Sequence, residues 1–536
     1  MQTKLTQDEP IEIIQAIELA KKQREISISE FFIKNKHLLG FDNLVKSLLT
    51  TIKEAVDNAL DACEEANILP EIKVEIEPLP NSRFRVSVQD NGPGIVKEQI
   101  PKIFGKLLYG SKFHKLSQSR GQQGIGISAS VLYAQLTTGK PAKIISRVSP
   151  RKPANYYEIH IDTSKNEPEI TKESEIEWEN GTGTKIEIEL EGKYQKGKRS
   201  TEEYLKQTAI ANPHVHLIYT SPENQRIEYP RVINKLPIKA KEIKPHPDGI
   251  ELGILISMLK NTNSRTLQSF LCSDFSRISS KVAKEICEKV NINTNARPSR
   301  IAKQEADNLL KVIRETKFMA PSTDCLSPIG ADALEKGLKK EVDAEFYASI
   351  TRPASVYRGN PFIIEASIAY GGALDKESPM DIIRFANRVP LLYQQSACAI
   401  NKSISSTNWR AYGLQQSGNN IPSGPVSIAI HIASVWVPFT SESKEAIAHY
   451  PEIVKEIKLA VQECGRQLGK YIRKNIRAKV EKQRISLFEK YIPELADALG
   501  DLSNEKKQII EENLYKILKK NSKTLLESEE NVKEER

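Results

Sequence analysis

The sequence has few cysteines and no long apolar run, and both absences narrow the class of protein. Its 536 residues include 6 cysteines without any CxxC spacing, so neither a zinc site nor a disulfide framework is expected, and the cysteines are predicted to be small buried apolar side chains. No apolar segment approaches the ~20 residues needed to cross a bilayer, and no signal-peptide pattern opens the chain. We therefore expect a cytoplasmic protein, whose length predicts roughly three or four domains.

Histidine is also scarce, and the net charge is modest. The 8 histidines include one close pair, His214 and His216, for which a loop entering a strand is favoured over a metal site. The net charge of +9 permits a polyanionic partner without requiring one.

The first half of the chain mixes one strong helix with alternating strands. Residues Lys46 to Ala66 form an amphipathic pattern with a helical period. Period-two alternation predicts strands at Ile72–Ile76, Phe84–Val88, Lys143–Val148, Tyr156–Ile161 and Lys185–Leu190. The fold class predicted through about Pro230 is therefore an α+β sandwich with mostly antiparallel strands.

The second half changes character after a proline- and lysine-bearing connector at 237–247. Residues 250–320 are predicted to form short helices. Strand patterns return at 361–370, 382–393 and 426–439. A long helix is expected from about Ile453 to Lys490, ending before Pro493, and the residues from about Lys506 are predicted to be helical with a frayed acidic end.

One face of the first helix carries oxygen-bearing side chains. Glu54, Asn58 and Asp61 are spaced i, i+4 and i+7, so they project from the same side. Magnesium prefers oxygen ligands and retains waters, so Asn58 is the candidate metal ligand, completed by phosphate oxygens. Glu54 is the candidate general base for a water attacking a terminal phosphate. Taken alone, this face is more typical of a solvated helix surface than of a binding site.

A second segment, Asp90-Asn-Gly-Pro-Gly94, places an acid directly after an apolar strand. Gly92 and Gly94 permit close backbone approach, and the Asp90 carboxylate can accept a hydrogen bond from an adenine amino group. The alternative is an ordinary β-turn.

A third segment, Arg120-Gly-Gln-Gln-Gly-Ile-Gly126, places three glycines directly before a predicted helix, as an anion site requires. Backbone amides at such a turn can hold phosphate oxygens, but the GxxGxG pattern alone is weak. It lacks the βαβ context of a dinucleotide site and the GK[ST] ending of a Walker A loop. The candidate nucleotide-binding residues here, with Thr184 beside the adenine, are Ser111, Lys112, Gly121, Gln122, Gln123, Gly124, Ile125, Gly126, Ile127, Ser128 and Thr184.

These three segments, in this order over residues 46–190, resemble the GHKL ATPase superfamily of gyrase, histidine kinase and MutL relatives. The resemblance implies an ATP-binding sandwich called the Bergerat fold, with ATP and Mg²⁺ as cofactors. Nearly the whole chain is further similar to the B subunits of type IIB DNA topoisomerases, the topoisomerase VI family. That similarity is carried by residues 104–112, 120–128, 384–393, 409–413 and 438–448.

The family resemblance implies a domain layout. It consists of an N-terminal arm (1–26), a GHKL ATPase domain (27–245), a helix–two-turn–helix domain (246–323), an α/β transducer domain with a long C-terminal helix (324–490) and a C-terminal helical tail (491–536).

The same resemblance assigns roles beyond the ATPase motifs. Lys444 is similar to a switch lysine that reaches the terminal phosphate and so joins Glu54 as a catalytic residue; without the family it would be interpreted as a surface lysine at a helix start. Ser128 departs from relatives that carry lysine there. Trp409-Arg410-Ala-Tyr412 is similar to a WKxY motif near DNA, which makes Trp409, Arg410 and Tyr412 candidate DNA contacts. The basic run on the long helix is either a solvated face or a duplex-steering surface.

The resemblance implies an archaeal, nucleoid-associated enzyme subunit. ATP would dimerise two copies around double-stranded DNA, and a separate A subunit bearing the catalytic tyrosine would cut the DNA within an A2B2 heterotetramer. This assembly would relax supercoils and decatenate DNA. Three other functions stay open at this point: a histidine kinase, a MutL-like repair clamp, and a recombination scaffold with a degenerate ATP site.

Overall fold

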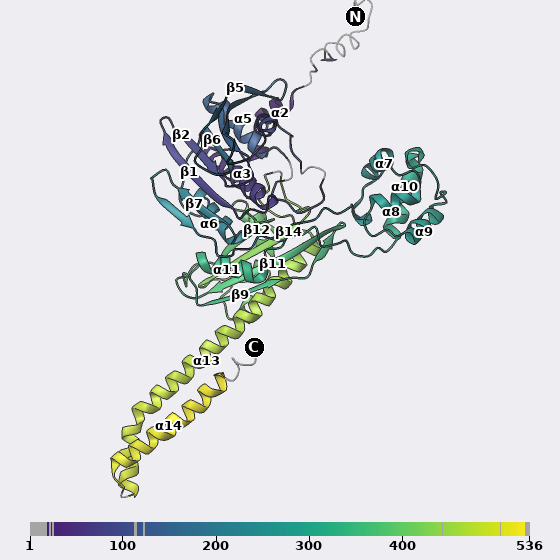
Figure 1. Ribbon diagram of the computed structural model, residues 1–536. Coiled ribbons are helices and arrows are strands. Elements are labelled where there is room, and N and C mark those ends of the chain that lie inside the picture. The colour runs from purple at the N-terminus through teal and green to yellow at the C-terminus, as the bar shows by residue number, and fades with distance from the viewer. Residues whose placement is uncertain are drawn as a thin grey trace, which may run out of the picture. The chain divides into compact units, whose positions relative to one another are not determined.

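The computed structural model describes residues 19–20, 23, 26–111, 115–121, 124–441, 443–503 and 505–530 (Figure 1). They form two compact units, one made of the chain up to Thr407 with Gly418–Cys464, the other of Asn408–Ser417 with the chain from Gly465 onward. Most of the predicted N-terminal arm and the acidic end lie outside the described residues. Among the described helices, none combines the length and apolar character that crossing a bilayer requires.

An eight-stranded sheet organises the N-terminal part of the first unit. Its order is β5-β4-β3-β6-β2-β1-β7-β8, and every neighbouring pair is antiparallel except β1 with β7. The strands are β1 (Glu71–Leu79), β2 (Arg83–Gln89), β3 (Ala142–Arg147), β4 (Ala154–Asp162), β5 (Glu167–Ile176), β6 (Gly183–Glu191), β7 (His216–Thr220) and β8 (Arg226–Tyr229). Alternate residues of β1 are buried and exposed, as in a sheet with one covered face.

Helices pack on the covered face of this sheet (Figure 1). They are α2 (Ile28–Lys34), α3 (Leu44–Glu65), α4 (Ile100–Gly105), α5 (Gly126–Thr138) and α6 (Thr201–Ala211). The α3 helix begins at Asn43, whose side chain accepts the Lys46 N–H, and its apolar stripe, including Ile52 and Leu60, is fully buried. The predicted helix and the predicted α+β sandwich are confirmed.

The predicted helical segment after the connector is also confirmed. It contains α7 (Leu252–Asn261), α8 (Leu267–Asp274), α9 (Ser280–Val290) and α10 (Lys303–Glu315), which enclose a core of their own. Thr266 and Ser279 cap the N-termini of α8 and α9 with their hydroxyl oxygens.

A second sheet has the order β10-β11-β14-β12-β13, with β9 also paired to β11. Its strands are β9 (Phe346–Thr351), β10 (Ser355–Tyr357), β11 (Asn360–Tyr370), β12 (Asp381–Ala386), β13 (Val389–Pro390) and β14 (Val426–Ser434). The single strand predicted over 382–393 is wrong, because Asn387 and Arg388 take left-handed φ angles of 49° and 68° and turn the chain between β12 and β13. The strand predicted at 426–439 ends five residues earlier, at Ser434.

The long helix runs further than predicted. The α13 helix spans Pro451–Ser503, so the expected end before Pro493 is wrong, and α14 (Lys507–Glu530) follows. A proline inside a helix costs about 3 kcal/mol. Ile492 and Ala496 on either side of it are buried, and this packing offsets that cost.

The two sheets are joined by α11 (Ala331–Glu341), which packs against α6. A shared core contains residues from α6, α11 and three strands of the second sheet: Ile210, Ala211, Leu334, Leu338, Ala369, Ile383, Phe385 and Ala429. Gly337 lies where the helices meet, and a Cβ added there would lie 2.3 Å from the Ile210 carbonyl oxygen. This close backbone approach requires glycine.

We predict that Gly337→Ala separates α11 from α6 and lowers the stability of the folded protein by about 1–3 kcal/mol, the usual cost of overpacking. Thermal unfolding followed by circular dichroism would show it as a lower melting temperature. Gly253→Ala in α7 is the matched control, since nothing lies within 4 Å of its added Cβ, and it should leave melting unchanged or slightly raised. Equal melting of the two variants would contradict the prediction.

Candidate nucleotide site

A cavity of about 380 Å³ lies beside α3 and the glycine-rich turn. Most of the predicted nucleotide-site residues line it: Glu54, Asn58, Asp61, Asp90, Gly94, Ser111, Gly121, Gly124, Ile125, Gly126, Ile127, Thr184 and Lys444. The three sequence segments therefore meet at one place. Apolar side chains that sequence reasoning missed complete the wall, among them Val88, Ile95, Phe104 and Ile186.

Asp90 is fixed at one wall of this cavity. Its Oδ1 accepts hydrogen bonds from the backbone N–H groups of Gly92 at 2.8 Å and Thr184 at 3.1 Å. No described residue donates to Oδ2, so that oxygen is available to a ligand. Burial raises the pKa of the Asp90 carboxyl to about 6, although the two backbone donors lower it.

The turn after Asp90 is shaped by its glycine and its asparagine. Gly94 has a φ of 71°, and an added Cβ would lie 2.1 Å from the Arg147 carbonyl oxygen. The Asn91 side chain accepts the Glu71 N–H at 2.8 Å and donates to the Leu69 carbonyl at 3.1 Å. Asn91 thus holds the turn to the loop after α3 and to the start of β1.

Glu54 and Gly126 are in direct contact across the cavity. A Cβ added to Gly126 would lie 1.7 Å from Glu54 Oε2. The first residue of α5 is therefore a glycine because the Glu54 carboxylate occupies the space of a side chain. Asn58, one turn along α3, is exposed toward the cavity, and no described residue hydrogen-bonds its amide.

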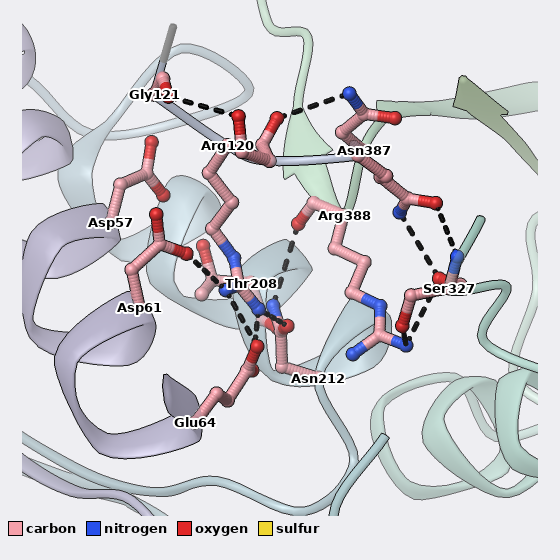
Figure 2. A network of polar contacts seen from close by, with 12 residues as sticks. Asp57, Asp61, Glu64, Arg120, Gly121, Thr208, Asn212, Ser327, Asn387 and Arg388 are labelled. Carbon is pink, nitrogen blue, oxygen red and sulfur yellow. Dashed lines mark hydrogen bonds and ion pairs between the residues drawn. The ribbon is translucent and has the colours of Figure 1, made fainter. Parts of the chain in front are cut away.

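Asp61 is engaged by the protein itself. Its Oδ1 accepts a hydrogen bond from Arg120 Nη1 at 2.6 Å, and Arg120 also pairs with Glu64 at 2.7 Å (Figure 2). Burial alone would raise the pKa of Glu64, but Arg120 and His214 hold it well below its usual range. His214, for which the sequence favoured a loop before a strand, lies 2.8 Å from Glu64 Oε1.

Among the described residues, the predicted binding residues Gly92 and Ser128 do not line the cavity. Lys112, Gln122 and Gln123 lie outside the described residues. The Gly92 amide is used by Asp90, and Ser128 is buried with its hydroxyl donating to the Ile125 carbonyl at 3.0 Å. The nucleotide contacts of these two stay predictions, with the Gly92 N–H and the Ser128 hydroxyl proton already used inside the protein.

Lys444, which follows the last strand of the second sheet in the sequence, also lines the cavity. It lies in a turn with a φ of 54°, where its N–H donates to the Ser441 carbonyl at 3.1 Å, and not at a helix start. Its neighbour Glu445 forms a buried ion pair with Lys46 of α3 and accepts a hydrogen bond from Gln394 at 2.6 Å. Burial alone would lower the pKa of Lys46, but Glu445 and Asp42 raise it.

Asp57, between Glu54 and Asn58 on α3, is a residue that sequence reasoning missed. It is buried, and the Tyr204 hydroxyl donates to its Oδ1 at 3.1 Å. Burial raises the pKa of Asp57 to about 7. Tyr204 itself lines the cavity, so Asp57 supports the wall from behind.

Comparisons with known proteins agree with this geometry. The family model described as topoisomerase VI B subunit, transducer, matches residues 321–484, and the one described as histidine kinase-, DNA gyrase B-, and HSP90-like ATPase matches residues 43–193. The B subunit of type 2 DNA topoisomerase 6 from Methanococcoides burtonii is 52% identical over 91% of this chain and 78% of its own length. The Archaeoglobus fulgidus protein of that name is 46% identical over 93% and 83%. The chain belongs to the topoisomerase VI B subunit family.

Family membership confirms the expected fold class. The ATPase family model covers α3 to β6 of the eight-stranded sheet and its helices, and the transducer model covers the second sheet with the start of α13. The chain is thus an ATP-hydrolysing subunit of a topoisomerase VI type enzyme.

The family's DNA motif needs one correction. Trp409, in the short helix η6 (Trp409–Tyr412), is fully buried, and its backbone N–H donates to Gln416 Oε1 at 3.0 Å. The predicted DNA contact of Trp409 is wrong, because a side chain without exposed surface cannot touch a duplex. Arg410 is exposed and Tyr412 half-buried, and both stay predictions.

We predict that Gly126→Ala displaces the Glu54 carboxylate and lowers ATP turnover about 100-fold, the usual range of a general base. Phosphate release under saturating ATP would measure it. Gly253→Ala in α7 is the matched control, since no atom in the described part of the chain lies within 4 Å of its added Cβ and the residue does not line the cavity. Full turnover in Gly126→Ala would show that the position of Glu54 does not matter.

Proposed function

We propose that this chain is the ATP-driven clamp subunit of a type IIB DNA topoisomerase. One observation carries the proposal: Lys444 and Glu445, from the transducer, line the same cavity as Glu54 and Asp90. A ligand in this cavity would touch both domains, so its loss would change the contacts between them. This arrangement suits a nucleotide-driven change in transducer position.

ATP would be held by parts with separate tasks. The unpaired Oδ2 of Asp90 would accept the adenine amino group, and the apolar wall would cover the ring. The amides of the glycine-rich turn at the start of α5 would hold the phosphates. Asn58 would provide the protein oxygen for Mg²⁺, which suits its exposed and unpaired amide.

Hydrolysis would then depend on two charged residues. Glu54 would take a proton from the attacking water, and Lys444 would pair with the terminal phosphate, which their position in the cavity lining supports. When that phosphate leaves, Lys444 loses its partner, and the transducer turn that carries it is released from the nucleotide.

The remaining parts of the proposal concern partners. The relatives are B subunits by name, which supports a separate A subunit that cuts double-stranded DNA, in an A2B2 assembly whose B subunits dimerise on ATP. Arg410 and Tyr412 are proposed to contact the duplex, and the helices α13 and α14 to dock the A subunit. Strand passage through the cut would relax supercoils and decatenate DNA.

The proposal predicts ATP-dependent relaxation of supercoiled plasmid when the chain is combined with an A subunit. Glu54→Ala should retain ATP binding and ATP-dependent dimers but lose hydrolysis by about 100-fold or more, because only the base is removed. Phosphate release, light scattering and gel electrophoresis of the plasmid would measure the three properties. ATP hydrolysis without any relaxation would instead favour a repair clamp.

A second prediction concerns adenine recognition. The ionised Asp90 accepts a hydrogen bond that the acid form does not, and its pKa of about 6 means that ATP affinity should fall as the pH falls through 6. Asp90→Asn should remove this pH dependence and weaken ATP more than GTP. Calorimetric titrations from pH 5 to 8 would measure both.

The pKa of Asp57 is also near neutral, at about 7. The Asp90→Asn variant therefore shows which of the two carboxyl groups causes the pH dependence of ATP affinity. A pH dependence that persists in Asp90→Asn would point to Asp57 instead.

A further inference from the structure

The segment that leads into the glycine-rich turn is tied to the transducer, not to the nucleotide cavity. Residues 116–120 do not line that cavity, whereas Gly121 does. Their backbone is paired with segments on both sides of the helical domain: the Ile243 N–H donates to the Leu116 carbonyl at 3.0 Å, and the Gln118 N–H to the Cys325 carbonyl at 2.9 Å. The root of the turn is thus held from outside the ATPase sandwich.

Gln118 reinforces this connection with its side chain. Its Nε2 donates to the Ser327 carbonyl at 3.0 Å, and its Oε1 accepts the Ser327 N–H at 2.6 Å. The amide therefore pairs with both backbone groups of one residue, as a strand partner would. Ser327 in turn accepts hydrogen bonds from Arg388 Nη2 at its hydroxyl and its carbonyl (Figure 2).

The turn between β12 and β13 contacts the next residue of the root. Asn387 Nδ2 donates to the Ser119 carbonyl at 3.1 Å and to the Ser434 carbonyl at 2.9 Å. Its Oδ1 accepts the Ser434 N–H at 2.9 Å. One asparagine amide thus connects the end of β14 with the residue before Arg120.

Arg120 closes the same network from the ATPase side. Besides Asp61 and Glu64, its guanidinium donates to Asn212 Oδ1 at 2.6 Å, and Asn212 Nδ2 donates to the Arg388 carbonyl at 3.4 Å. The Arg388 N–H donates to His431 Nε2 at 3.0 Å.

The path continues into the middle of the second sheet. His431 Nδ1 lies 2.7 Å from Glu365 Oε2, and both side chains are fully buried. A shift of β12 and β14 would therefore move the root of the glycine-rich turn.

We propose that Gln118 and Asn387 are positioning residues through which the transducer sets the position of the glycine-rich turn. The inference rests on the proposed function, since it assigns the turn to the nucleotide phosphates. It adds a route between transducer and nucleotide that does not pass through Lys444. Its direct consequence is selective: loss of a tether weakens the grip on phosphates but not on the nucleoside, which Asp90 holds.

The test compares ATP with adenosine as ligands of the full chain, by isothermal titration calorimetry. Gln118→Ala removes two hydrogen bonds and should raise the Kd for ATP about tenfold while leaving the Kd for adenosine unchanged. Gln135→Ala is the matched control. Its amide makes the same pair of bonds with the backbone of Ile161, at 3.0 and 2.8 Å, away from the root of the turn, and both ligands should bind it normally.

Asn387→Gly is the second variant, because glycine keeps the left-handed backbone and removes only the amide. The same selective loss of ATP affinity is expected. When either substitution is combined with Lys444→Ala, the increase in the Kd for ATP should be the product of the two single increases. Free-energy changes at independent sites add in this way.

The outcomes are separable. Unchanged ATP binding in both variants, or equal weakening of ATP and adenosine, would overturn the positioning role. A combined effect no larger than that of Lys444→Ala alone would overturn the second route. A parent protein that binds neither ligand would overturn the proposed function itself and this inference with it.

Discussion

The buried guanidinium of Arg120 is the interaction on which the site depends. It is paired with Asp61 and Glu64, both on α3, and those two carboxylates with the Asn212 amide offset its desolvation. Removing one partner of such a buried cluster typically costs about 3–5 kcal/mol, since a charge is left without compensation. The pairing fixes the root of the glycine-rich turn against the helix that presents Glu54 and Asn58. The spacing between the candidate base and the candidate phosphate loop is therefore set by a group that touches neither.

A second buried cation extends this constraint into the transducer. Arg388 is buried, and no carboxylate of the described residues forms a salt bridge with it. Burial lowers its pKa to about 10, so it is still charged at neutral pH. Its guanidinium donates to Ser327 and to the Pro328 carbonyl. Such a charge is tolerable only while these oxygens stay in place. The ion pair of Lys46 with Glu445 makes a separate connection beside Lys444.

The sequence predicts those site residues whose roles can be recognised from their immediate neighbours in the chain. Glu54 and Asn58 follow from a helical period, and Asp90 from a strand followed by a turn, so each could be recognised within a few residues. Arg120 stands in a recognisable motif, but its partners are 56 and 59 residues away, and no local pattern reveals such pairings.

The wrong predictions have the same cause. The aromatic residue of a supposed DNA motif is buried, and a helix continues through Pro493, because packing outweighs local propensity at both places. The turn at Asn387 and Arg388 interrupts a sequence that alternates like one strand, and the side-chain contacts of Asn387 with Ser434 and Ser119 fix its geometry. Those contacts depend on the tertiary structure alone.

The three glycines of the GxxGxG pattern, at 121, 124 and 126, have different structural roles. Gly124 has a left-handed φ of 57°, which bends the chain into α5. Gly126 leaves room for the Glu54 carboxylate, whereas no atom of the described residues lies within 4 Å of a Cβ added at Gly121. Only an open position of this kind suits direct approach of a phosphate to the backbone. A glycine-rich turn in this fold therefore carries information about the catalytic carboxylate as well as the ligand, and a phosphate loop without a facing acid would have no need of glycine at position 126.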